Sequence, residues 1–436
     1  MKVDPSRRWQ LLTVAGATLA LVAGMVSTAP SAYAGGKVQN PDNENQWVSI
    51  GMGVRTNFTS AEDASASGGQ WSNTFGVNNA RIYIMGKIHK YVGFEFNTEC
   101  FNCPNSGNAA GGGGTNTFGS NSSMGLLDAI GKFEFNELVN VWVGRMLVPS
   151  ERGELNGPFY HAVFDGFRTP LNQSDFSTNF GSGGAGMYGR DNGAVFYGKI
   201  HPAGTHLQYV GGIFTGLQSS STSGPNQRNS LKYAGRLTWN LLNEEKNPGY
   251  YTSGTYYGTA GDILAIAVGG EYQNASAGTL ANQAAYGNFT SDVLFEKVLP
   301  NQGVFTFNAE YKRYWAQDLA ATQTGGPTTG GGGCYCMFNG TSVTAYALYL
   351  FPQEIGIGRF QPYGRYTHVN SVYANAADEF EGGVNYIISG HNARISAYYR
   401  NGDYAGITSG NNTLIVNSTG AGQHRDSVTL ALQLQY

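Results

Sequence analysis

The last ten residues, Ser427 to Tyr436 (SVTLALQLQY), alternate between two kinds of side chain, and a period of two indicates a β-strand with two environments. One series is apolar and ends in an aromatic: Val428, Leu430, Leu432, Leu434 and Tyr436. The other series is small or polar and carries no charge. Strands of outer-membrane barrels combine an apolar side towards lipid with a polar side towards a wet lumen, although a soluble sandwich strand can share the pattern. We interpret this stretch as a closing strand and Tyr436 as the residue that the barrel-assembly machinery reads.

The first residues have the organisation of a secretory signal peptide. A positively charged start is followed by an apolar run over 11–26 and by an A-x-A cleavage site that ends at Ala34. We predict a signal peptide over 1–34 and a short periplasmic leader over 35–46. No later stretch approaches the roughly 18 uninterrupted apolar residues that a membrane-spanning helix needs.

The composition excludes several classes of protein. The chain has 63 Gly, 27 Tyr and 23 Phe, but only 13% of its residues are charged, whereas soluble domains usually have about 25%. The mean hydropathy of −0.27 excludes a helical membrane protein and suits a barrel, because half of each barrel strand faces water. A net charge of −3 gives no basic excess, so we expect no nucleic-acid partner.

Alternation recurs through 47–436, which we predict to be an all-β domain, a transmembrane antiparallel β-barrel. Loops rich in Ser, Gly and Asn alternate with connections of a few residues, a rhythm typical of long outer loops and short periplasmic turns. The connection 243–261 departs from this rhythm, because a short turn is due there. A large soluble β-helix or sandwich would not explain the alternation of connection lengths. We count sixteen strands, with fourteen and eighteen as alternatives: 47–57, 80–89, 91–97, 126–135, 139–146, 193–200, 206–214, 231–240, 263–272, 292–298, 304–315, 342–351, 359–369, 380–388, 393–400 and 427–436.

Three short stretches resemble the phosphate-selective porin O and P family. The stretch 143–149 (VGRMLVP) is similar to the family's strand-to-loop signature, and 381–388 (EGGVNYII) with 398–400 (YYR) is similar to its late hairpin. The ending from His424 is also similar. The resemblance implies an outer-membrane porin of a Gram-negative bacterium, with homotrimers as in that family. Leu147 stands where the family pattern often has Lys, and the chain is not rich in Lys, so phosphate selectivity is not carried over.

The polar series of the strands carries the charges that would line a lumen and set ion selectivity. Ten basic residues fall on it: Arg55, Arg81, Lys87, Lys132, Lys232, Arg236, Lys312, Arg365, Arg394 and Arg400. Five acidic residues fall on it as well: Glu95, Asp128, Glu134, Glu310 and Glu381. The basic excess, and the affinity of the arginine fork for anionic oxygens, predict a weak anion preference. The alternative is that these groups pair across strands and cancel.

The longest irregular stretch, 148–185, is the candidate constriction loop. Its aromatic residues indicate that it packs on something, which in a barrel is the inner wall, although packing on neighbouring outer loops is an alternative. We predict that its charged side chains, together with one at the end of the preceding strand, border the pore: Arg145, Glu151, Arg152, Glu154, His161, Asp165 and Arg168.

The four cysteines form two local pairs in predicted outer loops, Cys100 with Cys103 and Cys334 with Cys336. Disulfides are the expectation outside the cell. A bridge between the two loops is an alternative to the two local pairs, since a Cys334–Cys336 ring would be very small. A Cys₄ zinc site also fits the residue types. Covalent haem is disfavoured because Pro104, and not His, follows Cys103.

These observations favour a passive diffusion channel for small anions or other small hydrophilic solutes, embedded in outer-membrane lipid. We expect no cofactor, no bound metal and no enzymatic activity, because G-x-S-x-G, H-E-x-x-H and Walker motifs are absent from the sequence. The alternative function is a barrel that serves as a sheath for a partner in its lumen, such as an electron-transfer protein.

Overall fold

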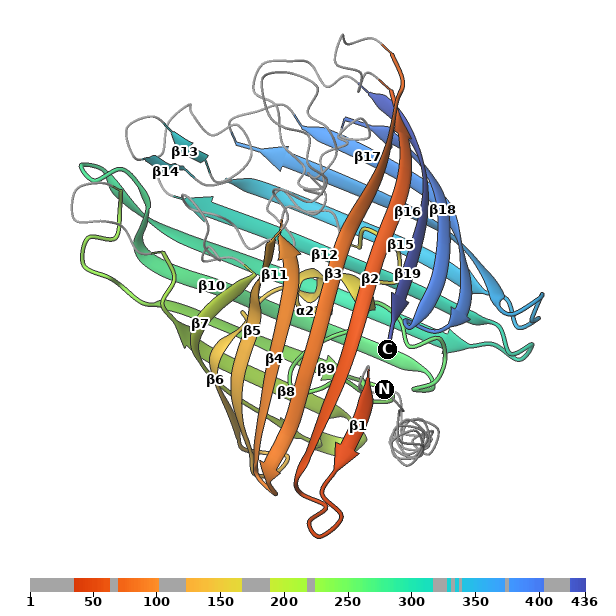
Figure 1. Ribbon diagram of the computed structural model, residues 1–436. Coiled ribbons are helices and arrows are strands. Elements are labelled where there is room, and N and C mark those ends of the chain that lie inside the picture. Colours follow the sequence, from red (N-terminus) through yellow and green to blue (C-terminus); the bar gives the residue numbers. More distant parts are fainter. Residues whose placement is uncertain are drawn as a thin grey trace, which may run out of the picture.

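The computed structural model describes residues 35–62, 70–101, 123–166, 189–217, 224–316, 328–330, 334–336, 339–372, 376–403 and 424–436. Sixteen long strands among them form one closed antiparallel β-barrel (Figure 1), as the alternation predicts. The predicted signal peptide, Cys103 and Arg168 lie outside the described residues. No helix of the described part is long and apolar enough to cross a membrane.

The barrel strands follow one another around the wall in chain order. They are β2 (Trp47–Ala61), β3 (Ser72–His89), β4 (Val92–Phe101), β5 (Ser123–Glu134), β6 (Asn140–Leu147), β7 (Arg190–Ile200), β8 (His206–Phe214), β9 (Lys232–Asn240), β10 (Ile263–Gly278), β11 (Gln283–Val298), β12 (Val304–Ala316), β15 (Gly340–Leu350), β16 (Arg359–Ser371), β17 (Ala377–Ser389), β18 (Ala393–Gly402) and β19 (Arg425–Gln435). Shorter elements are the strands β1 (Gly36–Gln39), β13 (Thr328–Gly330) and β14 (Cys334–Cys336), the helix α2 (Arg152–Asn156), and the 3₁₀ turns η2 (Pro158–Tyr160) and η3 (Pro202–Gly204).

The seam of the barrel joins the last strand to the first long one. β19 pairs with β2 in unbroken antiparallel register from Ser427 opposite Ala61 to Gln435 opposite Gly53. Beyond this register, Tyr436 and Met52 exchange two backbone hydrogen bonds of 2.8 Å each. The seam therefore leaves no free strand edge at this point of the wall, which is what a sheet in lipid requires.

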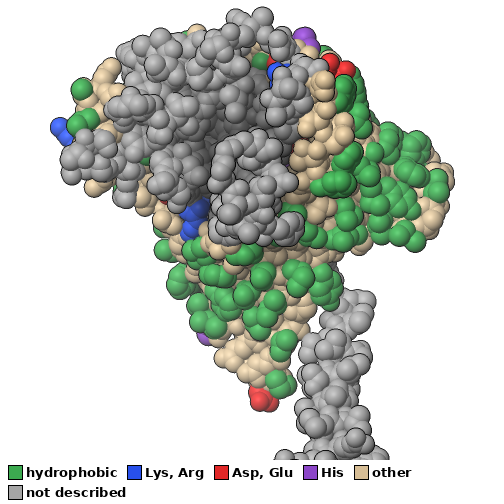
Figure 2. Space-filling view, turned by 45° about the horizontal axis from the view of Figure 1, so that its top comes forward, with side chains coloured by type: hydrophobic (Ala, Val, Ile, Leu, Met, Phe, Trp, Pro, Cys, Tyr) green, Lys and Arg blue, Asp and Glu red, His purple; other side chains and the backbone are tan. Residues whose placement is uncertain are grey.

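The two series of side chains on each strand meet different surroundings. On β19, Val428, Leu430 and Leu434 are exposed, whereas the small or polar series from Ser427 to Gln435 is buried inside. Apolar side chains gather over the described outer wall in the same way (Figure 2). The closing strand thus has the orientation that its sequence predicts.

The ends of the barrel differ in the length of their connections. At one end β3 and β4, β17 and β18, and other pairs are joined by a few residues; we call it the short-turn end. In outer-membrane barrels this end faces the periplasm. β1 lies there too and pairs with the first residues of β2, so part of the predicted leader is a strand.

Several strands extend further than their sequence patterns predict. β10 extends to Gly278 and β11 begins at Gln283, so only four residues join the two strands. Predicted strands end at 272 and begin at 292 here, so the prediction of a long loop is wrong. The added residues are mostly Ser, Asn, Gly and Ala, and they lack the apolar alternation on which the prediction relied.

Removal of Tyr436 should impair closure, since it deletes both hydrogen bonds with Met52 and the aromatic ring at the apolar face. We expect a clear loss of heat-modifiable barrel on gels of outer-membrane fractions. The variant Tyr436→Phe keeps the backbone and the ring and should behave as the parent. Normal assembly of the truncated chain would contradict this role of Tyr436.

Candidate pore constriction

The chain turns into the barrel after β6. Residues 148–166, which we call the first lumen segment, contain α2 and η2 and lie inside the wall (Figure 1). All but one of these residues are buried, and Tyr160 is half-buried. The described part of the predicted constriction loop therefore packs in the lumen.

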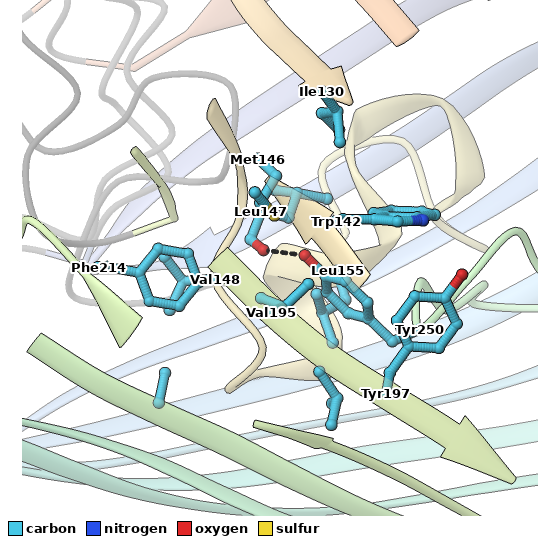
Figure 3. Packing of buried hydrophobic residues seen from close by; sticks show 12 residues of the cluster. Ile130, Trp142, Met146, Leu147, Val148, Leu155, Val195, Tyr197, Phe214 and Tyr250 are labelled. Carbon is cyan, nitrogen blue, oxygen red and sulfur yellow. Dashed lines mark hydrogen bonds between the residues drawn. The ribbon is translucent and has the colours of Figure 1, made fainter. Parts of the chain in front are cut away.

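One side of the first lumen segment rests on an apolar patch of the inner wall. Val148 and Leu155 pack with inward side chains of β5–β9, among them Trp142 and Val195 (Figure 3). Val143 and Phe196 on the same strands point outwards and are exposed. This sector of the wall is therefore apolar on both faces, because one face meets lipid and the other meets the first lumen segment.

The start of α2 is held by polar and charged side chains of β12. The Glu151 carboxylate is paired with Lys312, and it accepts a 2.5 Å hydrogen bond from the Tyr314 hydroxyl. The backbone N–H of Gly153 donates to Glu310 Oε2 at 3.0 Å. These contacts satisfy donors and acceptors that would otherwise be buried without partners.

Arg152 is a fully enclosed charge of the constriction, with a side chain that is 0% exposed. Its guanidinium donates to both carboxylate oxygens of Glu245 at 2.6 and 2.9 Å. Its Nε donates to Asp292 Oδ1 at 2.7 Å, and Arg236 pairs with the same carboxylate at 2.6 Å. Such a bidentate arrangement fixes the geometry as well as the charge.

The far side of the first lumen segment is held by side chains of the opposite wall. Arg394 Nη1 donates to the carbonyls of His161 at 2.7 Å and Ala162 at 3.1 Å, and Arg365 Nη1 donates to that of Gly166 at 2.7 Å. Arg55 donates to the carbonyl of Phe164. The segment thus crosses the lumen from the β5–β9 wall to the wall formed by β16–β19 and β2.

A second stretch enters the lumen from the short-turn end. Residues 243–261 between β9 and β10, the second lumen segment, contain a run that is buried from Thr252 to Tyr257. The Tyr250 hydroxyl donates to the carbonyl of Leu147 at the end of β6 at 2.5 Å, and the N–H of Gly254 donates to the carbonyl of Tyr160 in the first lumen segment at 2.8 Å. This contact with the first lumen segment explains why the connection is longer than the rhythm of turns predicts.

Most of the predicted wall charges lie inside and are paired. Arg81 pairs with Glu99 at 2.7 Å, Lys132 pairs with Glu95, and Arg190 pairs with Asp128 at 2.6 Å. Lys87 and Glu134 are about a third exposed and 3.5 Å apart.

The remaining predicted wall and loop residues are also placed. Lys232 pairs with Asp191 and Glu271 at 3.3 and 3.5 Å, and Arg365 and Arg400 both pair with Glu381 at 2.6 Å. The other positions of the constriction prediction follow. Asp165 pairs with Arg400, Glu154 is buried, and Arg145 is half-buried and donates to the Leu127 carbonyl at 2.9 Å.

The predicted excess of basic residues in the lumen is wrong. Among the described residues, eleven basic and fourteen acidic side chains are buried. Glu99 and Glu379 lie beyond the predicted strand ends, because the strands that carry them are longer than predicted. Glu271, Asp292 and Glu296 lie within predicted strands, but the sequence count of inward acidic residues does not include them. Stricter phasing of those strands would have found the last three residues.

Cys100 is disulfide-bonded in the structure. The side chains of Cys334 and Cys336 lie outside the description, so the connectivity stays a prediction. Within the described ranges, no group of three or more His, Cys, Asp or Glu side chains could hold a metal ion.

Comparisons with solved structures identify the fold. The chain is similar to an anion-selective porin from Comamonas acidovorans, with a TM-score of 0.50, 13% identity, and 89% of this chain and 99% of that chain covered. It is equally similar to the outer-membrane channel DcaP of Acinetobacter baumannii (TM-score 0.50, 12% identity, 93% and 100% covered) and to OmpF of Salmonella typhi in complex with daunomycin (0.50, 11%, 90% and 98%). No protein-family model and no curated protein sequence matches the chain. The fold is that of the outer-membrane porins of Gram-negative bacteria.

The substitution Arg152→Met should destabilise the barrel. It leaves the buried Glu245 carboxylate without a cation and removes one of the two arginines that pair with Asp292. We expect a loss of about 3–5 kcal/mol in the free energy of unfolding, measured by urea titration in lipid vesicles. Lys199→Met is a matched control: its pair with Glu244 is about a quarter exposed, and its loss should cost less than about 1 kcal/mol. Equal effects of the two substitutions would contradict the role of the buried cluster.

Acid should loosen the first lumen segment through His161. Burial, with the nearby charges of Arg55 and Arg394, holds the pKa of His161 well below its ordinary value of 6.5. The unfolded chain therefore takes up a proton below pH 6.5 that the folded barrel refuses. The free energy of unfolding should fall by up to about 1.4 kcal/mol per pH unit in that range.

The contribution of His161 is measured by comparing pH profiles of urea unfolding for the parent and for His161→Gln. The variant lacks the titrating ring, so its stability should depend less steeply on pH between 6.5 and 5. Parallel profiles would show that His161 does not refuse the proton.

Proposed function

We propose that this protein is an outer-membrane porin, a passive diffusion channel for small hydrophilic solutes. The observation that carries the proposal is a closed sixteen-strand barrel with an apolar outer wall and a charged interior that an inward-folded segment narrows. A barrel with this distribution is stable in lipid and offers a polar path across it. The likeness to known porins supports the fold on which the proposal rests.

The alternative function, a barrel that serves as a sheath for a partner protein, fits the structure less well than a porin does. It needs a lumen that is open over the width of the partner, whereas the two lumen segments occupy the interior and bind each other. Lipid and the barrel-assembly machinery are the partners that follow from a porin function. A homotrimer remains an inference from the resemblance to the porin O and P family.

Ion preference is the finer part of the proposal, and we expect it to be weakly towards anions. The surplus of carboxylates inside does not support it, but most of those carboxylates are paired with Lys or Arg. Arg394 differs, because its described partners are the carbonyls of His161 and Ala162 and the amide of Gln433. Its positive charge is therefore not neutralised locally and acts on ions near the constriction.

Reconstitution of the purified protein in planar lipid bilayers tests the function and the preference together. We expect stepwise single-channel conductance and, across a potassium chloride gradient, a small reversal potential in the direction of anions. Replacement of Arg394 by Gln should move the reversal potential towards cations. Lys90→Gln removes the same charge from the exposed β3–β4 turn and should leave the reversal potential unchanged. Cation preference of the parent would overturn the ion preference, and absence of conductance would overturn the porin function.

A further inference from the structure

The second lumen segment leaves and rejoins the wall at the same point of the short-turn end. The N–H of Leu241 donates to the Leu264 carbonyl at 2.8 Å, and the N–H of Asn243 donates to the Asp262 carbonyl at 3.1 Å. β9 and β10 are thus already a closed hairpin at this pair, and two residues would suffice to join them. The residues in between serve something other than the connection.

The second lumen segment is anchored to the inner wall by β11. The Glu296 carboxylate accepts hydrogen bonds from the N–H groups of Tyr256 at 3.0 Å and Gly258 at 2.8 Å, and from the Thr255 hydroxyl at 2.6 Å. Tyr257 packs with inward apolar side chains of β12, β15 and β17. A carboxylate in the wall therefore serves as the fixed point around which this part of the segment is held.

The second lumen segment is also joined to the first one along its length. Glu245 accepts hydrogen bonds from both terminal nitrogens of Arg152, and Thr252 Oγ1 donates to Asn156 Oδ1 at 2.7 Å. His391 in the β17–β18 turn contacts Ser253 Oγ at 3.1 Å and the carbonyl of Thr255 at 2.9 Å. The segment therefore touches the first lumen segment and two separate parts of the wall.

We propose that residues 244–261 form a second constriction, which narrows the pore from the short-turn end and sets its conductance and size limit together with the first lumen segment. The inference rests on the proposed porin function. The geometry carries it because the residues serve no connecting purpose, are buried inside the barrel, and fill space beside the segment that crosses the lumen. Only small ions and solutes should pass where both segments lie.

Excision of the second constriction is the most direct test. Replacement of 244–261 by Asn-Gly keeps the hydrogen-bonded pair of Asn243 and Asp262 and gives a standard two-residue hairpin turn. We expect the variant to form a heat-modifiable barrel, to conduct at least about twofold more per channel than the parent, and to admit larger sugars in liposome swelling. A matched control shortens the exposed turn 352–357 at the same end of the barrel and should conduct as the parent does.

A point substitution covers the case in which the excised chain does not assemble. Lys246 is the exposed cation of the second constriction. Lys246→Glu should move the reversal potential towards cations without disturbing the buried contacts. Lys90→Glu makes the same charge change in the exposed β3–β4 turn and should have a smaller effect.

The outcomes separate this inference from the porin function. A folded excision variant that conducts like a conducting parent overturns the second constriction alone, as does a Lys246→Glu effect no larger than that of Lys90→Glu. Failure of both the folded parent and the folded excision variant to conduct overturns the porin function and the inference with it. A weakly conducting parent with a strongly conducting excision variant supports both.

Discussion

The constraint on which this structure depends is that a sheet in lipid must have no free edge. An unbonded backbone group in hydrocarbon costs several kcal/mol by order of magnitude, so β19 has to find β2. The seam meets this demand residue by residue, down to the reciprocal pair of Tyr436 and Met52. Once the wall is closed, every second side chain points into a confined interior. What fills that interior then decides what the barrel can do.

The interior is filled by charge pairs and by the chain itself. Isolated charges are costly in such surroundings, and the buried arginines and lysines accordingly lie against carboxylates or backbone carbonyls. The wall and the lumen segments satisfy each other: Arg394 and Arg365 use carbonyls of the first lumen segment, and Glu296 uses N–H groups of the second. Both segments are an integral part of the folded barrel, because these buried polar groups of the wall would lack partners without them.

The sequence predicts the fold wherever a strand crosses the apolar band, as in 427–436, because lipid on one face and polar groups on the other impose a period of two. It predicts less beyond the band, where the ends of β10 and β11 have water-compatible residues on both faces. The second lumen segment was recognised only as a break in the rhythm of turns. Its four tyrosines are the signal that was available, since a short exposed turn has no use for so many rings. The partners of Arg152 were beyond prediction, because they lie in the second lumen segment and in β11, about 90 to 140 residues away in the sequence.

The crossing of the lumen by the first segment also bears on how the chain assembles. The strands of the seam are far apart in the sequence: Thr59 and Thr429, which touch through their hydroxyls at 2.9 Å, are 370 residues apart. Strand pairings between residues so far apart in the sequence form slowly, because the chain must lose much conformational entropy before any stabilising contact forms. The first segment lies between the two in sequence and binds side chains near both ends, with Arg55 on β2 and Gln433 on β19 holding its carbonyls. The first lumen segment can therefore act as an internal template. β2 and β19 each bind to it across a shorter separation in the sequence, and the barrel then closes around it.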